Sequence, residues 1–181
     1  MADFRTAVNI TLRPDHEGGF QNEVNDWANW DGGKPVMEQY LQTQDASLLV
    51  HLRGTKYGIT AQDMPGLDIK NLTPDQAIAY YQEHYWKPLY SQIQSQLVAN
   101  KLFDMGVLFG VGEAVKLLQL ATHIESDGIF GEESLAAINS VNETSLLSAY
   151  KTLLVSYTLR IALNNPTERG NVVGWGRRIN F

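Results

Sequence analysis

The stretch TPDQAIAYYQEHYWKP, residues 73–88, carries both ends of a helix and its buried face. Thr73 supplies a hydroxyl for the N-cap, Pro74 stands in the first turn, and Gln76 can bond back to the cap. Apolar positions then recur at helical spacing: Ala77, Ile78, Tyr81 and Tyr85. Because the residue before a proline avoids helical backbone angles, Pro88 ends the segment. We therefore predict a helix that stops before Pro88.

Most of the remaining chain shows the same periodicity. Apolar stripes predict helices from Phe4 to Pro14 or the glycines after it, and over residues 96–109, 114–121, 132–138 and 146–161. Residues 22–54 are richer in Asn, Asp, Gly and Pro, so we expect a long loop followed by a short helix. The strand-like alternation of apolar and polar residues is nowhere sustained in the sequence. The predicted fold class is all-α.

Composition limits the classes of function. A chain of 181 residues with 44% apolar residues fits one domain, or two small lobes that share a core. The absence of cysteine excludes disulfides and thiol nucleophiles. A formal charge of −6 argues against nucleic acid as a partner. No apolar run approaches the roughly 20 residues of a membrane-spanning helix, so we expect no membrane insertion.

The stretch DHEGGF, residues 15–20, places a carboxylate, Glu17, directly before two glycines. Since glycine adopts positive φ without strain, Gly18 and Gly19 should stop a helix and leave Glu17 at its end. A glycosidase needs a protonated carboxyl group to protonate the leaving oxygen, and burial against apolar groups raises a carboxyl pKa. Aromatic residues close in sequence are compatible with such a site and equally with ordinary packing. Both interpretations stay open at this point.

Other chemistries lack their residues. The four histidines are not spaced as metal ligands, the glycine-rich segment at 106–112 lacks a Walker lysine, and no G-x-S-x-G elbow occurs. We therefore predict no metal site and no cofactor.

Several ordered blocks resemble one enzyme family. Residues 17–20 (EGGF) resemble the E-G-G-Y/F signature of the family 108 glycoside hydrolases, which include N-acetylmuramidases and holin-associated secretion activators. Residues 55–60 (TKYGIT) and 80–89 (YYQEHYWKPL) are similar to two further elements of that family. The second half resembles the peptidoglycan-binding-type region attached to these enzymes, through LFDM at 102–105, LLQ at 117–119, DGIFG at 127–131 and GWGRR at 174–178.

The resemblance implies a lysozyme-like helical fold with two lobes around a cleft. It divides the chain into a muramidase-like catalytic region, residues 1–94, and a peptidoglycan-binding-type helical region, residues 95–181, sharing one core. Residues 34–53 have no counterpart in the family pattern and form an insertion. This insertion would line the cleft, narrow the substrate range or block long glycan strands.

The activity implied is that of a lysozyme-type N-acetylmuramidase, which cleaves the β-1,4 bond between N-acetylmuramic acid and N-acetylglucosamine. Glu17 would be the general acid. The family carries a second acid in a short segment that this sequence matches only in part. Either Asp26 or Glu23 would correspond to that second acid. The residues implied to lie near the substrate are Phe20, Thr55, Tyr57 and Thr60.

The implied partner is the glycan strand of peptidoglycan. The first residues, MADFRTAVNITLRPD, lack a basic start and a long apolar core, so we expect cytoplasmic synthesis without a signal peptide. Action in the periplasm or at the cell wall would then need release, by a holin-like membrane pore, a phage lysis cassette or a secretion machine. Two alternatives remain: a non-catalytic wall-binding or secretion-assisting protein on the same fold, and a scaffold that docks a partner through its insertion.

Overall fold

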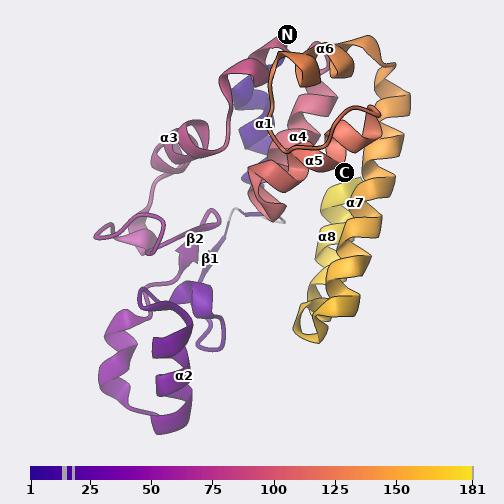
Figure 1. Ribbon diagram of the computed structural model, residues 1–181. Helices are drawn as coiled ribbons and strands as arrows, with labels where there is room; N and C mark the ends of the chain where they lie inside the picture. The colour runs from indigo at the N-terminus through magenta and orange to yellow at the C-terminus, as the bar shows by residue number, and fades with distance from the viewer. Residues whose placement is uncertain (14–15, 18, 181) are drawn as a thin grey trace. The chain divides into compact units, whose positions relative to one another are not determined.

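The structure is a computed structural model that describes residues 1–13, 16, 17 and 19–180 (Figure 1). Contacts within the chain define two compact units. One comprises Met1–Ile10 with Tyr81–Phe181, and the other comprises Thr11–Tyr80. The first unit thus joins the start of the chain to its second half. Among the described residues, no helix is both long enough and apolar enough to cross a bilayer.

The unit of Met1–Ile10 and Tyr81–Phe181 is helical. Its elements are α1 (Phe4–Thr11, up to Ile10), the end of α3 (Pro74–His84), η4 (Pro88–Gln92), α4 (Gln96–Phe109), α5 (Val111–Ala121), α6 (Glu132–Ser140), α7 (Glu143–Asn164), η5 (Pro166–Asn171) and α8 (Val172–Asn180). The helices predicted from apolar stripes are present within a few residues of their expected ends. The predicted helical, lysozyme-like fold class is confirmed.

Helix α4 forms the centre of this unit. Every residue from Val98 to Gly106 is buried, as expected of a helix with neighbours on all sides. Helices α5, α7 and α8 pack against it, and α7 and α8 lie side by side (Figure 1). The ring of Phe103 lies 5.7 Å from that of Phe4 and 5.8 Å from that of Trp86, centroid to centroid. Aromatic packing therefore holds α1 and the segment that follows α3 onto α4.

A buried ion pair joins α4 to α8. The Arg178 guanidinium donates through Nη2 to Asp104 Oδ1 at 2.8 Å and through Nε to Asp104 Oδ2 at 3.3 Å. Only 2% of Asp104 and 6% of Arg178 is exposed. Buried charges need such paired hydrogen bonds to offset their lost hydration. The LFDM and GWGRR motifs thus meet in the core, where they hold α8 in place.

The unit of Thr11–Tyr80 contains a small antiparallel sheet, which the all-α prediction lacked. Its strands are β1 (Phe20–Gln21), β2 (Thr55–Lys56) and β3 (Ile59–Thr60), in the order β1-β2-β3. With two residues each, they are too short to show an alternating pattern in sequence. The remaining elements are η1 (Trp27–Asn29), α2 (Gly33–Thr43), η2 (Ala46–His51), η3 (Ile69–Asn71) and the start of α3.

The insertion at residues 34–53 folds into α2 and η2, and its two ends meet. The backbone N–H of Asp31 donates to the carbonyl of His51 at 2.9 Å, and Trp30 and Leu52 form an isolated antiparallel bridge. Trp30 is fully buried, and its ring centroid lies 5.2 Å from that of Tyr40 in α2. The loop expected first and the short helix expected later are present, as residues 22–32, which hold only the short η1, and as η2, but α2 between them was not predicted. The buried Trp30 gives α2 a surface to pack against.

Candidate active site

Glu17 lies six residues beyond the end of α1, so the prediction that the glycines stop this helix and leave Glu17 at its end was wrong. Its backbone N–H donates to the carbonyl of Thr11, the last residue of α1, at 3.1 Å, and Thr11 is fully buried. The helix ends three positions before Pro14, in agreement with the backbone preference that proline imposes. Glu17 itself is half-buried. The predicted role of Gly18 in the turn lies outside the described residues.

The sheet brings the EGGF motif to the TKYGIT motif. Phe20 in β1 lies opposite Lys56 in β2, and Gln21 lies opposite Thr55. Strand β2 then pairs with β3, where Thr60 lies opposite Thr55. Phe20, Thr55 and Thr60 therefore belong to one sheet, which begins three residues after Glu17. Phe20 is 38% exposed, so its ring is available for contact with a ligand.

Tyr57 occupies the tight turn between β2 and β3. Its φ of 55° and the φ of 71° at Gly58 define a two-residue turn of the type that suits the twist of a hairpin. A positive φ is unfavourable for a residue with a bulky side chain, and such backbone strain is more common at functional sites than elsewhere. The Lys56 ammonium lies 5.3 Å from the centroid of the Tyr57 ring.

The two threonines differ in how their hydroxyl groups are used. Thr60 Oγ1 donates to Asp63 Oδ2 at 2.8 Å and accepts from the N–H of Gln62 at 3.1 Å. It therefore closes a local turn. Thr55 Oγ1 donates to the carbonyl of Ala28 at 3.5 Å, a long bond that a ligand can replace.

The two candidates for a second acid are held differently. Asp26 is half-buried and caps η1, where its Oδ1 accepts from the N–H of Ala28 at 3.0 Å. Glu23 has an exposed side chain, although its carbonyl accepts from Asn29 Nδ2 at 3.1 Å. Of these two candidates, Asp26 alone has a carboxylate that accepts a recorded hydrogen bond from the described residues.

A charged cluster at the base of the insertion escaped the sequence analysis. Asp31 Oδ1 lies 2.8 Å from His51 Nδ1, and Asp31 Oδ2 lies 3.9 Å from a guanidinium nitrogen of Arg53. Asp31 and Arg53 line an open pocket of about 450 Å³ together with Gln62 and residues 65–67. Nothing in the sequence pairs Asp31 with residues 20 and more positions away, because only the closure of the insertion brings them together.

The described residues offer no site for a resident metal ion. Among them, no three His, Asp or Glu side chains gather closely enough to act as ligands.

Comparison with known proteins agrees with this arrangement. The sequence profile of glycosyl hydrolase family 108 matches residues 11–110, more than half of the chain. The chain belongs to glycosyl hydrolase family 108. A second profile, described as a predicted peptidoglycan domain, matches residues 113–180 of this family 108 protein. The chain is therefore a glycoside hydrolase that acts on peptidoglycan, and its place of action is the periplasm or the cell wall.

Solved structures share the fold of this family 108 chain. The structure of SagA from Brucella abortus superposes with a TM-score of 0.63 at 20% identity, over 98% of this chain and 94% of that chain. None of the curated proteins matches significantly.

The DGIFG turn of the peptidoglycan-domain match is held by Gln119. Gln119 Nε2 donates to Asp127 Oδ1 at 2.8 Å, and its Oε1 accepts from the N–H of Gly128 at 2.9 Å. The N–H of Ile129, followed by Gln119, lowers the pKa of Asp127 by stabilising its carboxylate. These hydrogen bonds hold the turn in place in the family 108 chain.

Proposed function

We propose that this chain is a lysozyme-type N-acetylmuramidase that cleaves the β-1,4 bond between N-acetylmuramic acid and N-acetylglucosamine, with Glu17 as the general acid. The observation that supports the proposal is the pairing of Phe20 with Lys56, because it joins the strand that begins three residues after Glu17 to the TKYGIT hairpin. Glu17 is half-buried, and the hydrogen bond from its N–H to Thr11 fixes its backbone at the end of α1.

In the proposed reaction, the Glu17 carboxyl donates its proton to the bridging oxygen. The bond between that oxygen and the anomeric carbon of N-acetylmuramic acid breaks, water adds its hydroxyl to that carbon, and the remaining proton of the water restores the Glu17 carboxyl group. Proton donation by a positioned side chain accelerates such reactions by about 10²–10⁴-fold. Stabilisation of the positive charge that develops on the sugar ring supplies a further part.

Asp26 is the proposed second carboxylate, in preference to Glu23. A group that orients water or stabilises a cation must itself be held in place. The hydrogen bond from Ala28 holds Asp26, whereas the side chain of Glu23 is exposed. Phe20, Tyr57 and Thr55 are proposed to contact the sugar, and Thr60 to support the turn that carries them.

The test is the conversion of purified sacculi by the wild type and by Glu17→Gln, with mass analysis of the released fragments. Fragments ending in reducing N-acetylmuramic acid identify the bond. Glutamine keeps the shape of the side chain but carries no proton to donate, so release should fall by at least about 10²-fold with an unchanged circular dichroism spectrum. Retained release by Glu17→Gln would remove Glu17 from the mechanism.

Asp26→Asn and Glu23→Gln form a matched pair for the second carboxylate. We expect Asp26→Asn to slow the reaction by at least about 10²-fold, the lower end of the range for loss of one stabilising group, and Glu23→Gln to leave it near wild type. The reverse order would assign the second role to Glu23.

A further inference from the structure

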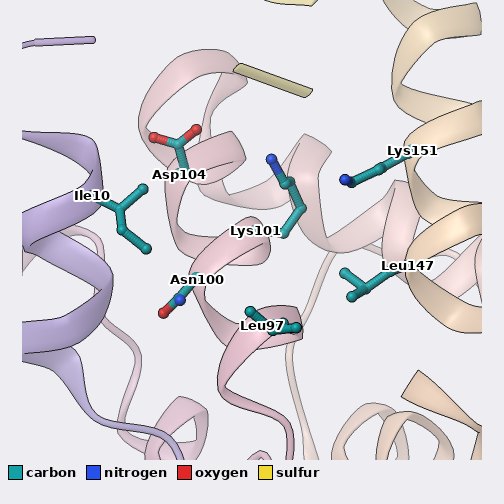
Figure 2. Close-up of a pocket in the computed structure, with 7 residues that line it drawn as sticks. All are labelled: Ile10, Leu97, Asn100, Lys101, Asp104, Leu147 and Lys151. Carbon is teal, nitrogen blue, oxygen red and sulfur yellow. The ribbon is translucent and has the colours of Figure 1, made fainter. Parts of the chain in front are cut away.

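A small pocket lies within the unit of Met1–Ile10 and Tyr81–Phe181, whereas the sheet that carries the proposed active site belongs to the other unit. It has a volume of about 120 Å³ and is bounded by α1, α4 and α7 (Figure 2). Its lining residues are Ile10, Leu97, Asn100, Lys101, Asp104, Leu147 and Lys151. Figure 2 shows the two lysine nitrogens toward one end and Leu97 with Leu147 toward the other. The Asp104 carboxylate lies toward the same end as the lysine nitrogens, so the pocket has a charged end and an apolar end.

The polar groups of the pocket are deeply set. Lys101 is 6% exposed and Asn100 is 8% exposed. A lysine side chain is seldom buried unless its charge has a partner. Lys101 Nζ donates to the carbonyl of Arg178 at 2.5 Å, and Lys151 Nζ donates to the carbonyl of Asn180 at 3.1 Å. Each ammonium has three donors, so each keeps further N–H groups for another acceptor.

The charges around Lys101 favour an anion. Asp104 on the same helix faces Lys101, but its carboxylate accepts two hydrogen bonds from Arg178 on α8. Lys151 on α7 adds a second ammonium. Burial is the main cause that lowers the pKa of Lys101 to about 8; Asp104 opposes the shift, and Lys151 and Arg178 add to it. A bound carboxylate would accept from both lysines and relieve their mutual repulsion.

The size of the pocket limits the ligand. An enclosed cavity of about 150 Å³ holds a benzene molecule, so this partly open pocket of about 120 Å³ admits a group of about that size and not a whole N-acetylated sugar. A terminal alanine residue has as many non-hydrogen atoms as benzene. Its carboxylate suits the lysines, and its methyl group suits Ile10, Leu97 and Leu147.

We propose that this pocket binds the carboxylate end of an alanine-terminated peptide, as found on the stem peptides of peptidoglycan. The choice of occupant rests on the proposed function, because peptidoglycan presents such ends beside its glycan strands. The pocket would hold the substrate at a second point and would favour wall material whose stem peptides keep their terminal alanine.

The test is an NMR titration of the full chain with N-acetyl-D-alanyl-D-alanine. The matched ligand is the same dipeptide with a terminal carboxamide, and propionate is the small-carboxylate control. We expect shifts at residues 97–104 and 147–151 with the acid, at least tenfold weaker binding of the carboxamide, and weaker binding of propionate. Affinity for the acid should fall between pH 7 and pH 9 as Lys101 loses its proton, while affinity for the carboxamide stays constant.

Lys151→Met and Lys151→Arg are the matched variants, since Lys151 is less buried than Lys101 and its loss is compatible with folding. We expect at least fivefold weaker binding for Lys151→Met and near wild-type binding for Lys151→Arg, with both variants folded by circular dichroism. Equal affinity for acid and carboxamide, or shifts outside the pocket, would overturn the proposal. Propionate binding as tightly as the dipeptide would overturn the peptide as occupant.

The two proposals can fail separately. Glu17→Gln should abolish cleavage of sacculi and leave the dipeptide affinity unchanged. If the wild type binds the dipeptide but does not cleave sacculi, only the muramidase proposal is refuted. If it cleaves sacculi but does not bind the dipeptide, only the proposal for the pocket is refuted.

Discussion

Replacing Gly54 with alanine should separate β1 from β2 and so displace the residues that follow Glu17. Gly54 has a φ of +79°, and a Cβ added there would lie 2.6 Å from the backbone carbonyl oxygen of Gln21. It would also lie 2.6–2.7 Å from two ring carbons of Phe20. The backbone contact cannot be relieved by turning a side chain, so the strand itself must shift.

The magnitude has two parts. A left-handed backbone costs a residue with a Cβ about 1–2 kcal/mol, and overpacking costs about 1–3 kcal/mol. Gly54→Ala should therefore lower the free energy of unfolding by about 2–5 kcal/mol. Gly66 provides a matched control in the same unit, because its φ is +83° and a Cβ there would meet no atom within 4 Å. Gly66→Ala should cost only the backbone part, about 1–2 kcal/mol.

The measurement is urea unfolding followed by tryptophan fluorescence, in which Trp27 and Trp30 report on the unit of Thr11–Tyr80. Gly54→Ala should also release fragments from sacculi more slowly at temperatures where it stays folded. Equal destabilisation by the two variants, within about 0.5 kcal/mol, would refute the steric argument and with it the close approach of β1 to Gly54.

Three further predictions concern single side chains. Tyr57→Asn should keep the β2–β3 turn, since asparagine tolerates a positive φ. The rate of cleavage of sacculi should fall roughly 2- to 10-fold, because an aromatic contact is worth about 0.5–1.5 kcal/mol. An unchanged rate would contradict contact between Tyr57 and the substrate. Because the pKa of Lys101 is about 8 in the folded chain against 10.5 ordinarily, the unfolded chain holds this proton more tightly. Between about pH 8 and about pH 10.5, the unfolding free energy of the wild type should therefore rise by up to roughly 3 kcal/mol relative to that of Lys101→Met. Urea unfolding of both proteins across this pH range is the measurement. Parallel pH profiles of the two proteins would contradict the lowered pKa of Lys101. Arg178→Met removes the guanidinium from a buried carboxylate and should cost about 3–5 kcal/mol, much of it recovered in Asp104→Leu/Arg178→Met; a loss under 1 kcal/mol would argue against a buried pair.

The helices were predictable because their determinants are local. The cap at Thr73 forms as expected: its N–H donates to Gln76 Oε1 at 2.9 Å, and its Oγ1 accepts from the N–H of Gln76 at 3.3 Å. Similar bonds form at Thr60 and Asp63, yet no helix follows them, because Pro65 and Gly66 come too soon. Each outcome depends on residues within one or two turns of the chain.

The sequence by itself determined the helical class, the main helix boundaries and the motif that contains Glu17. Only the tertiary structure decided that Phe20 lies opposite Lys56, that the insertion closes on itself at Asp31 and His51, and that Arg178 meets Asp104. Helix periodicity repeats every few residues and is visible in any short window. The pairing of β1 with β2, the contact of Asp31 with His51 and the buried pair of Asp104 with Arg178 join residues 20 to 74 positions apart, and their energy appears only when the folded chain brings the partners together.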